Sequence, residues 1–418
     1  MDEAIYANQS SKGGTARSCC GDALGTTLEF QPRPNEPVIK SMVGGGPFNL
    51  RAGEWTDDTS MMLCLADSLI DCNRSDPADQ IRRYIAWRDD GYQSCTGTCF
   101  DIGSTVAQAL DLFEETGSAL AGSTSEYSAG NGSLMRVAPV ALFTHHHPLR
   151  IAMSLATESC LTSHGEQHCI DACRYMTFLI HTLLAAQTQP LKADLLSPDN
   201  SELSPYLSEM HADTLQVIQG SYRTKKRDEI SSSGFVIHSL EAALWCFWHS
   251  DDFTEGALLA ANLGDDADTV AAIYGQLAGA YYGYDAIPKD WCNTLAWRSV
   301  IESRALLLIN RPSQQAIREF IDECMPNPEY SFTMTSDIFY ELIVVFDWQA
   351  WSRDFARKRY IQNQHNIASA PLTDCLCLIT IIVRSDRFCD GIIRQCASDG
   401  TIGALLNRLD HFADKEPS

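Results

Sequence analysis

The amino-acid sequence predicts an all-α protein of packed helices. Apolar residues recur at helical spacing along much of the chain, whereas the alternation of apolar and polar residues that marks strands is scarce. Hydrophobic residues make up 45% of the 418 residues, enough for a large packed core. Only 20% of the residues are charged, which argues against wholesale disorder.

The N-terminal part of the chain contains a tail, a short helix, a loop and one strongly predicted helix. Residues 1–15 are polar and are expected to form a flexible tail. Residues 16–30 favour a short helix of small residues, and the glycine-rich stretch 41–54 favours a loop. A helix is predicted over 57–71 after the suitable N-cap residue Thr56, because apolar residues follow at helical spacing: Leu63, Ala66, Leu69 and Ile70.

The rest of the chain favours further helices and one polar excursion. Helices are predicted over 76–90, 103–115, 134–143, 150–160, 168–187, 235–250, 267–282, 292–304 and 313–323. Residues 186–233 are more polar and contain three prolines and a basic run, so a surface excursion with one or two short helices is expected there.

We expect a main domain over 16–310 and a helical accessory region over 330–418, joined by the proline-containing segment 310–330. The accessory region either docks on the main domain or recruits a target protein, or it serves packing alone. Of these interpretations, we favour structural packing.

Charge and cysteine content exclude some classes of function. The net charge of −23 argues against a general nucleic-acid binder, which needs Lys and Arg to displace phosphate counterions. The same charge suits a protein that binds cations or a positive target, although better solubility explains most of the acidic excess.

The sixteen cysteines include no Cys-x-x-Cys pair and many lie in apolar runs, so reduced thiols and a cytoplasmic location are expected. The N-terminal residues lack the basic region and apolar core of a signal peptide, so none is expected, and no apolar run reaches the roughly 18 residues of a membrane span. No interaction with a membrane or a nucleic acid is expected.

Two acidic clusters carry most of the chemistry in this sequence. Each lies where a loop enters an apolar helix: Trp55-Thr-Asp-Asp-Thr59 and Gly264-Asp-Asp-Ala-Asp-Thr269. Adjacent carboxylates repel one another, so a shared cation would stabilise them far more than a helix dipole. Carboxylates and hydroxyls are hard ligands that suit Mg, Mn or Ca. The alternative is that both clusters only cap helices, and the spacing alone leaves the two interpretations balanced.

Six segments, in order, resemble the ADP-ribosylglycohydrolase family, whose prototype is the dinitrogenase reductase-activating glycohydrolase. The segments are Gly21-Asp-Ala-Leu-Gly25 with Glu29, Gly53-Glu-Trp-Thr-Asp-Asp-Thr59, Gly97-Thr-Cys-Phe-Asp-Ile-Gly103, Gly130-Asn-Gly-Ser-Leu-Met-Arg136, Thr162-Ser-His164 and Gly264-Asp-Asp-Ala-Asp-Thr-Val-Ala-Ala-Ile-Tyr-Gly275. One departure is Asp265, which stands where the family usually has glycine. The resemblance covers residues 16–305.

The resemblance implies an orthogonal helical bundle with a binuclear Mg²⁺ or Mn²⁺ centre in a cleft and a C-terminal helical extension. The implied metal ligands are Thr56, Asp57, Asp58, Asp266, Asp268 and Thr269. Asp57 or Asp58 would move the proton of a metal-activated water, and we assign this role to Asp57.

The resemblance also implies the substrate, ADP-ribose joined through its anomeric carbon to a protein side chain. The implied substrate-binding residues are Glu29, Asp101, Gly103, Asn131, Gly132, Ser133, Met135, His164 and Phe235. Asp101 would bind the guanidinium of an arginine, unless it only caps the next helix. Phe235 would stack on the ligand, unless it is a core residue. The following His238-Ser239 replaces a common Asp-Thr, so any polar contact from this loop stays open.

Three functions follow as hypotheses: a hydrolase of ADP-ribosyl-arginine, a hydrolase of another linkage such as ADP-ribosylserine, and a silent ADP-ribose-binding protein. Asp101 favours arginine. Elsewhere, His164 and His168 are spaced as zinc ligands, but no further ligand is evident from the sequence, and we favour core or hydrogen-bonding roles for them.

Overall fold

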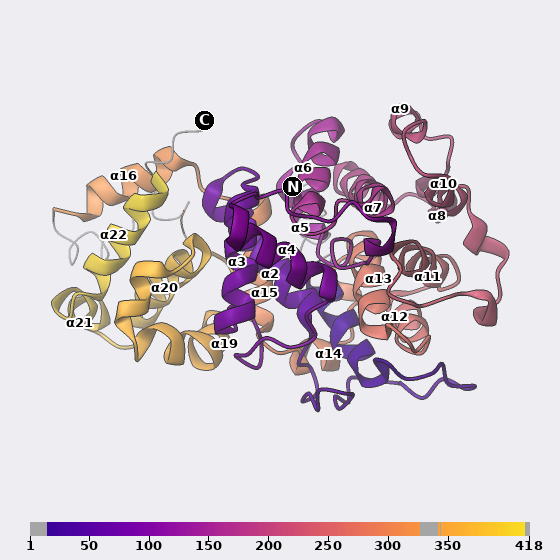
Figure 1. Cartoon of the computed structure of the whole chain (residues 1–418). Coiled ribbons are helices and arrows are strands. Elements are labelled where there is room, and N and C mark those ends of the chain that lie inside the picture. Colours follow the sequence, from indigo (N-terminus) through magenta and orange to yellow (C-terminus); the bar gives the residue numbers. More distant parts are fainter. Residues whose placement is uncertain (1–14, 327–341, 343, 414–418) are drawn as a thin grey trace. The chain divides into compact units, whose positions relative to one another are not determined.

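The computed structural model describes residues 15–326, 342 and 344–413. These residues contain many helices and, in place of a sheet, three isolated bridges, so the predicted all-α class is confirmed. The chain forms two compact units (Figure 1). Unit 1 comprises Met1–Ala66 and Ser75–Arg298, and unit 2 comprises Asp67–Arg74 and Ser299–Ser418. Unit 2 therefore contains the last turns of a helix that begins in unit 1.

Unit 1 contains the helices predicted before residue 290. It begins with a helix over 15–25, followed by η1 (Thr26–Leu28). The longer helices that follow are α2 (Asp57–Cys72), α3 (Pro77–Asp90), α4 (Ser104–Thr116), α6 (Leu149–Leu161), α7 (Gln167–Ala185), α11 (Val236–Trp248), α12 (Phe253–Ala261) and α13 (Ala267–Tyr282). Shorter helices are α5 (Ala138–Phe143) and α14 (Lys289–Thr294).

Helix α13 forms the centre of unit 1. It contacts α7, α11 and α12, which surround it in Figure 1, and every residue from Ala267 to Ala280 is buried. A helix that is apolar on all sides must lie inside a core. Its first turn carries Asp268 and Thr269, so the acidic start of α13 enters the protein interior.

Glycines bring the helix over 15–25 close to α13. A Cβ atom added at Gly21 would collide with the carbonyl oxygen of Ala271, and one at Gly25 would collide with Asp268 backbone atoms. Only glycine allows the two backbones to approach this closely. The contact places Asp22 and Glu29, on and after this helix, beside the acidic start of α13.

The helix predicted over 292–304 is divided in the structure, which corrects that prediction. Helix α14 ends at Thr294 and α15 (Arg298–Ile309) begins four residues later. The linking residues bind the loop before α2: Ala296 N–H donates to the Gly53 carbonyl at 2.9 Å, and Trp55 Nε1 donates to the Ala296 carbonyl at 3.3 Å. These tertiary hydrogen bonds replace the helical ones, and helical periodicity does not reveal them.

Helix α12 is an element that the sequence prediction lacked. Its central Gly256 lowers intrinsic helix propensity. In the fold this glycine is required, because a Cβ atom there would collide with the ring of Tyr274 on α13. The polar segment 186–233 contains more short helices than the one or two expected. They are three α-helices, α8 (Lys192–Leu195), α9 (Ser204–Leu207) and α10 (Ala212–Ile218), and two 3₁₀ helices, η3 (Ser221–Thr224) and η4 (Arg227–Glu229).

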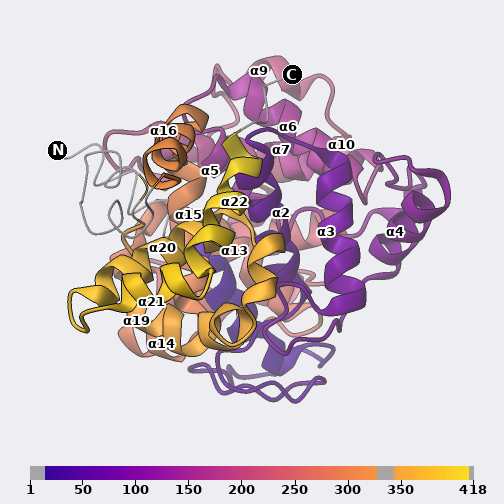
Figure 2. The same ribbon diagram turned by 90° about the vertical axis from the view of Figure 1, so that its left-hand side faces the viewer.

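Unit 2 is helical as well. Its elements are most of α15, α16 (Gln314–Cys324), α19 (Trp348–Trp351), a π-helix (Ser352–Ile361), η7 (Gln364–Ser369), α20 (Leu372–Asp386), α21 (Ile392–Ser398) and α22 (Thr401–Ala413). Helices α20, α21 and α22 contact one another (Figure 2). The fully buried Arg304 guanidinium forms ion pairs with Asp67 and Asp374, both at 3.0 Å. None of the described helices combines the length and the apolar character that crossing a bilayer requires.

Candidate functional site

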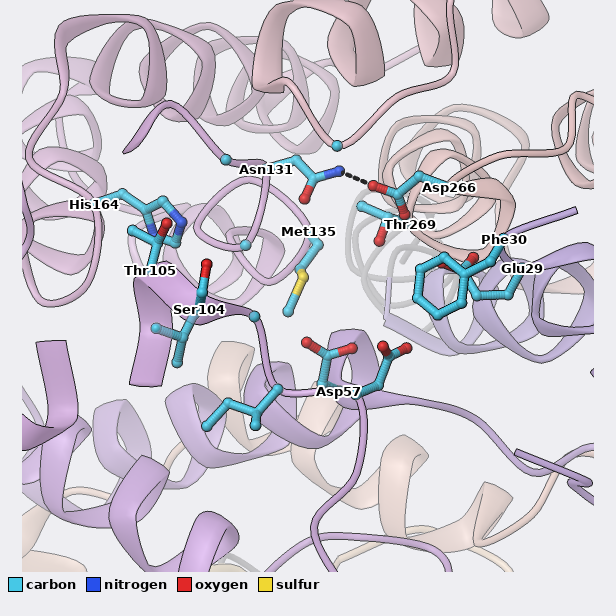
Figure 3. A pocket seen from close by; sticks show the side chains of 17 residues that line it. Glu29, Phe30, Asp57, Ser104, Thr105, Asn131, Met135, His164, Asp266 and Thr269 are labelled. Atoms are coloured by element: carbon cyan, nitrogen blue, oxygen red, sulfur yellow. Dashed lines mark hydrogen bonds between the residues drawn. The ribbon is translucent and has the colours of Figure 1, made fainter. Parts of the chain in front are cut away.

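A pocket in unit 1 collects side chains from segments that are far apart in the sequence. Its volume is about 360 Å³. Figure 3 shows Glu29, Asp57, Asp266 and Thr269 toward one side, and Ser104, Thr105 and His164 toward the other. Asn131 and Met135 lie between these two groups. The described lining residues include several carboxylates and neither Lys nor Arg, so the pocket is strongly acidic.

The two predicted acidic clusters meet at the floor of this pocket. The Thr56 hydroxyl lies 3.1 Å from Asp268 Oδ2, although 212 residues separate them. The Thr269 hydroxyl lies 3.3 Å from Asp58 Oδ2. The predicted convergence of Thr56–Asp58 with Asp266–Thr269 is therefore confirmed. Asp57, Asp266 and Thr269 line the pocket, while Thr56, Asp58 and Asp268 lie buried beneath.

Hydrogen bonds within the protein do not satisfy this cluster. The single hydroxyl hydrogen of Thr56 faces three carboxylate oxygens at 3.0–3.1 Å, those of Asp22, Asp58 and Asp268. It can be donated to only one of them. The other oxygen of Asp58, Oδ1, is buried without a hydrogen-bond partner. A buried carboxylate without compensation is costly, which favours a cation here.

Asp22 is a member of the cluster that sequence reasoning missed. Its Oδ1 accepts the Thr56 N–H at 2.9 Å, and its Oδ2 accepts the N–H and hydroxyl of Thr59. Asp22 thus caps the start of α2 from another helix. Its place inside Gly21-Asp-Ala-Leu-Gly25 was the available signal, because that segment already pointed to the site.

Burial and mutual repulsion raise the pKa values of these carboxyl groups. Burial, assisted by the charge of Asp268, raises the pKa of Asp22 to about 7 and that of Asp266 to about 7. The same causes raise the pKa of Asp101 to about 8. Burial also places the pKa values of Asp57 and Asp58 well above the ordinary value, with neighbouring aspartates adding to the shift. Cations would reverse these shifts by stabilising the ionised forms.

The carboxylates form two groups with metal-binding spacing. One is Asp22, Asp58 and Asp268; the other is Glu29, Asp266 and Asp268. In each group, one oxygen from every residue lies within 4.8 Å of the others. The groups share Asp268, and all their donors are hard oxygens. This donor set fits Mg²⁺ or Mn²⁺ and does not fit the nitrogen and sulfur preference of zinc.

Neither Asp101 nor Asp266 acts as a simple helix cap. The N-cap of α4 is Gly103, and α4 has no side-chain cap, so the capping alternative for Asp101 is wrong. Asp101 adopts a left-handed conformation with φ of 60° and lines the pocket, as does Gly103. Asp266 is the N-cap residue of α13 but makes no capping hydrogen bond. Its carboxylate accepts a hydrogen from Asn131 Nδ2 at 2.7 Å.

The glycine loop over 130–132 also lines the pocket. His164 packs against this loop: a Cβ atom at Gly132 would lie 3.0 Å from His164 Cε1, and one at Gly130 would lie 3.3 Å from Nε2. Burial and the nearby Arg136 lower the pKa of His164 to about 3, so its imidazole is neutral. Its Nδ1 is hydrogen-bonded to the Ser163 hydroxyl at 2.8 Å.

Two of the predicted substrate-binding side chains do not line the pocket. The Ser133 hydroxyl lies behind the loop, where it accepts hydrogens from the thiols of Cys160 and Cys173 at 3.3 and 3.4 Å. Phe235 is half-buried, and its ring packs edge-on against His168 and His238. The backbone of Phe235 pairs with Gly130, so it borders the pocket through its main chain.

Several pocket residues lay outside the prediction. Ser104 and Thr105, in the first turn of α4, line the pocket together with Phe30. Phe30 is 61% exposed, has φ of 56° and packs against Phe48. It immediately follows the predicted residue Glu29, which was the only signal for it.

The structure also explains two departures from the resembled motif. Asp265 has φ of 62°, its N–H donates to Gln31, and its carbonyl accepts from Phe30. A left-handed position explains a usual glycine, and aspartate tolerates it better than most residues. Ser239 accepts a hydrogen from Asn131 Nδ2 at 2.8 Å, so the altered loop still orients the amide that faces Asp266.

Comparison with known proteins matches this geometry to a described family. Residues 11–317 match the family model described as ADP-ribosylglycohydrolase. Residues 312–415 match a second model, described as a family of unknown function (DUF6508).

Individual relatives give the same picture. The chain is 42% identical over 304 residues to the ADP-ribosylarginine hydrolase Tri1 of Pseudomonas putida, covering 72% of this chain and 78% of that one. It is 30% identical to the ADP-ribosyl-[dinitrogen reductase] glycohydrolase of Rhodospirillum rubrum, covering 66% and 86%. A solved structure titled ADP-ribosylglycohydrolase-related protein complex aligns with a TM-score of 0.62 and 37% identity, covering 73% of this chain and 98% of that one.

Proposed function

Because this chain belongs to the ADP-ribosylglycohydrolase family, we propose that it is an enzyme that hydrolyses the bond between ADP-ribose and a modified arginine. The observation that carries this proposal is the meeting of Thr56–Asp58 with Asp266–Thr269 beneath a pocket. Two similar proteins, from Pseudomonas putida and Serratia proteamaculans, are named ADP-ribosylarginine hydrolases and are 42% and 41% identical to it. The proposed macromolecular partner is an ADP-ribosylated protein.

We infer two divalent cations, Mg²⁺ or Mn²⁺, at the pocket floor. The residues that would hold them are Thr56, Asp57, Asp58, Asp266, Asp268 and Thr269, with Glu29 and Asp22 adjoining. The buried and unpartnered Asp58 Oδ1 supports this inference. Bound cations of this kind orient ribose hydroxyls and lower the pKa of water.

We assign the proton transfer to Asp57. Asp57 lines the pocket, whereas Asp58 lies behind it, so only Asp57 reaches a substrate placed there. In the reaction, a water oxygen bonds to the anomeric carbon while the carbon–nitrogen bond to the guanidine breaks through an oxocarbenium-like state. Asp57 takes the proton lost by the water and passes it to the departing guanidine nitrogen, so the carboxylate is restored at the end of the reaction.

The remaining walls suit the other parts of the substrate. The first turn of α4 has N–H groups without helical partners, and Gly103 leaves open space before it. Together with the glycine loop over 130–132, these groups would bind the diphosphate. Asp101 would bind the guanidinium that leaves, because a planar cation and a carboxylate form paired charge-assisted hydrogen bonds.

A substrate panel tests the proposal. Peptides that carry ADP-ribosyl-arginine or ADP-ribosyl-serine are incubated with the metal-free protein, with and without added Mg²⁺ or Mn²⁺. We expect release of ADP-ribose from arginine only, and only with metal. Asp57→Ala and Asp266→Ala should abolish release while the circular dichroism spectrum stays unchanged.

Asp111→Ala provides the matched control, because Asp111 is an exposed carboxylate on α4 that pairs with Arg88 away from the pocket. This variant should retain full activity. Release from serine alone would contradict the arginine assignment. Full activity of Asp57→Ala with Asp266→Ala would contradict the metal centre.

A further inference from the structure

A second cluster of metal-binding side chains lies outside the acidic pocket. His168, at the start of α7, meets His211 and Asp213, at the start of α10, and one ligand atom of each lies within 4.8 Å of the others. The two imidazole rings are 3.8 Å apart between centroids. We propose that these three residues bind a divalent transition-metal ion of the Zn²⁺ type. The proposal does not depend on the hydrolase activity.

The hydrogen bonding of His168 supports a cation at this position. Its Nδ1 lies 2.9 Å from Glu166 Oε1, and its Nε2 lies 3.3 Å from Asp213 Oδ2. A neutral imidazole can donate a hydrogen to only one of these carboxylates. If Nδ1 donates to Glu166, the Nε2 lone pair faces Asp213, and a cation between them removes the repulsion.

Glu166 is placed to orient His168 as a metal ligand. Histidines that bind metals usually donate their other ring N–H to a carboxylate, which fixes the tautomer. Glu166 is buried, and it also accepts the backbone N–H of His168 at 2.7 Å, so its position is held by α7. The metal-facing nitrogen of His168 is thereby preorganised.

The other two ligands can adjust. The side chains of His211 and Asp213 are 42% and 51% exposed. Ligand atoms at about 2.0–2.1 Å from a tetrahedral zinc ion lie roughly 3.3 Å from one another. Asp213 Oδ2 already lies 3.3 Å from His168 Nε2 and 3.6 Å from His211 Nδ1. Rotation of the two exposed side chains closes the remaining gap. Imidazole ligands suit Zn²⁺, whereas the all-oxygen pocket suits Mg²⁺ or Mn²⁺, so the two sites select different ions.

The ion would join the polar excursion over 186–233 to the bundle. His168 and Asp213 are 45 residues apart, and α10 otherwise packs on α7 and α11. The His168 ring supports Phe235 at 5.4 Å, and the neighbouring Cys169 thiol donates to the Gly130 carbonyl at 3.2 Å. An ion here would therefore hold residues that border the pocket without touching its floor.

Calorimetry with the full chain tests the proposal. Metal-free protein in a large excess of Mg²⁺, which fills the oxygen sites, is titrated with Zn²⁺. We expect one Zn²⁺ per chain and a higher Tm in its presence. His211→Ala and Asp213→Asn should each weaken Zn²⁺ binding by at least about tenfold and remove the rise in Tm. Both side chains are exposed, and circular dichroism confirms that the variants fold.

Two variants separate this site from other sources of binding. His146→Ala removes a member of the other close imidazole pair, His145 and His146, whose rings are 3.6 Å apart. Asp266→Asn removes a carboxylate of the pocket. Both variants should bind Zn²⁺ like the unmodified chain. The proposal is overturned if no Zn²⁺ binds, if His211→Ala binds it unchanged, or if Asp266→Asn loses it.

Discussion

Oδ1 of Asp22 accepts a hydrogen bond of 2.9 Å from the backbone of Thr56, the residue that precedes α2. Replacing Asp22 by Ala leaves N–H groups at the start of α2 unpaired. In the presence of Mn²⁺, we expect this loss to lower the free energy of unfolding by about 1–3 kcal/mol. It also withdraws the acceptor that positions Thr56 beside Asp268. We expect a loss of activity of about 10–100-fold. Urea denaturation and initial rates on an ADP-ribosyl-arginine peptide measure both effects.

Asp76→Ala is the control for this variant. Asp76 caps α3 by accepting the Asp79 N–H at 3.0 Å, and it is not a residue of the pocket. Loss of this cap should cost about 0.5–2 kcal/mol and leave the rate unchanged. Equal rate losses in the two variants would show that Asp22 acts only through stability.

Without divalent metal, the protein should become less stable as the pH rises. The pKa of Asp22 and that of Asp266 are about 7 in the folded protein, against 3.8 ordinarily. Between these values the folded state holds more protons than the unfolded state, so stability falls with increasing pH. We expect the Tm of metal-free protein to fall from about pH 5 to about pH 8. Saturating Mn²⁺ should flatten this decline, and a Tm that rises over the same range would refute the crowding of buried carboxyls.

Asp101→Asn should impair the arginine substrate selectively. The substitution keeps the size of the side chain and removes the charge that would pair with the leaving guanidinium. A hydrogen bond to a charged group contributes about 1.5–3 kcal/mol, so kcat/KM on arginine peptides should fall by roughly one to two powers of ten. The Mn²⁺ affinity should change little in comparison. An unchanged kcat/KM would remove Asp101 from the recognition of arginine.

Gly132→Ala should distort the glycine loop. The added Cβ would lie 3.0 Å from His164 Cε1 and 3.4 Å from Val106 Cγ2. Overpacking of this kind costs about 1–3 kcal/mol, and a displaced loop should raise KM more than it lowers kcat. Gly403→Ala is the counterpart on α22, where an added Cβ meets nothing within 4 Å. That variant should be slightly more stable and fully active.

Local sequence predicted most helices of unit 1 and both acidic clusters. Asp and Thr at the starts of α2 and α13 are recognisable because their role depends on their own neighbours and on helix entry. Asp22 was missed because its role depends on the crossing of two helices, which Gly21 and Gly25 permit. A capping aspartate from another helix has no signature in the helix that it caps.

The misplaced elements have the same explanation. Residues 292–304 carry helical periodicity, but hydrogen bonds from Ala296 to Gly53 and from Trp55 to Ala296 interrupt the helix. Phe235 was expected either to stack on the ligand or to belong to the core; its ring packs on His168, and its backbone pairs with Gly130. Such outcomes depend on partners that are distant in the chain.

The membership of Asp67–Arg74 in unit 2 has a consequence for protein engineering. A fragment cut after residue 317, where the match to the ADP-ribosylglycohydrolase model stops, would keep Asp67 and Arg304 but discard Asp374. Removing one partner of a buried ion pair typically costs about 3–5 kcal/mol. Unit 2 is built from two separate stretches of the chain. Chimeras that exchange the C-terminal portion should therefore also exchange the end of α2, so that both stretches come from the same protein.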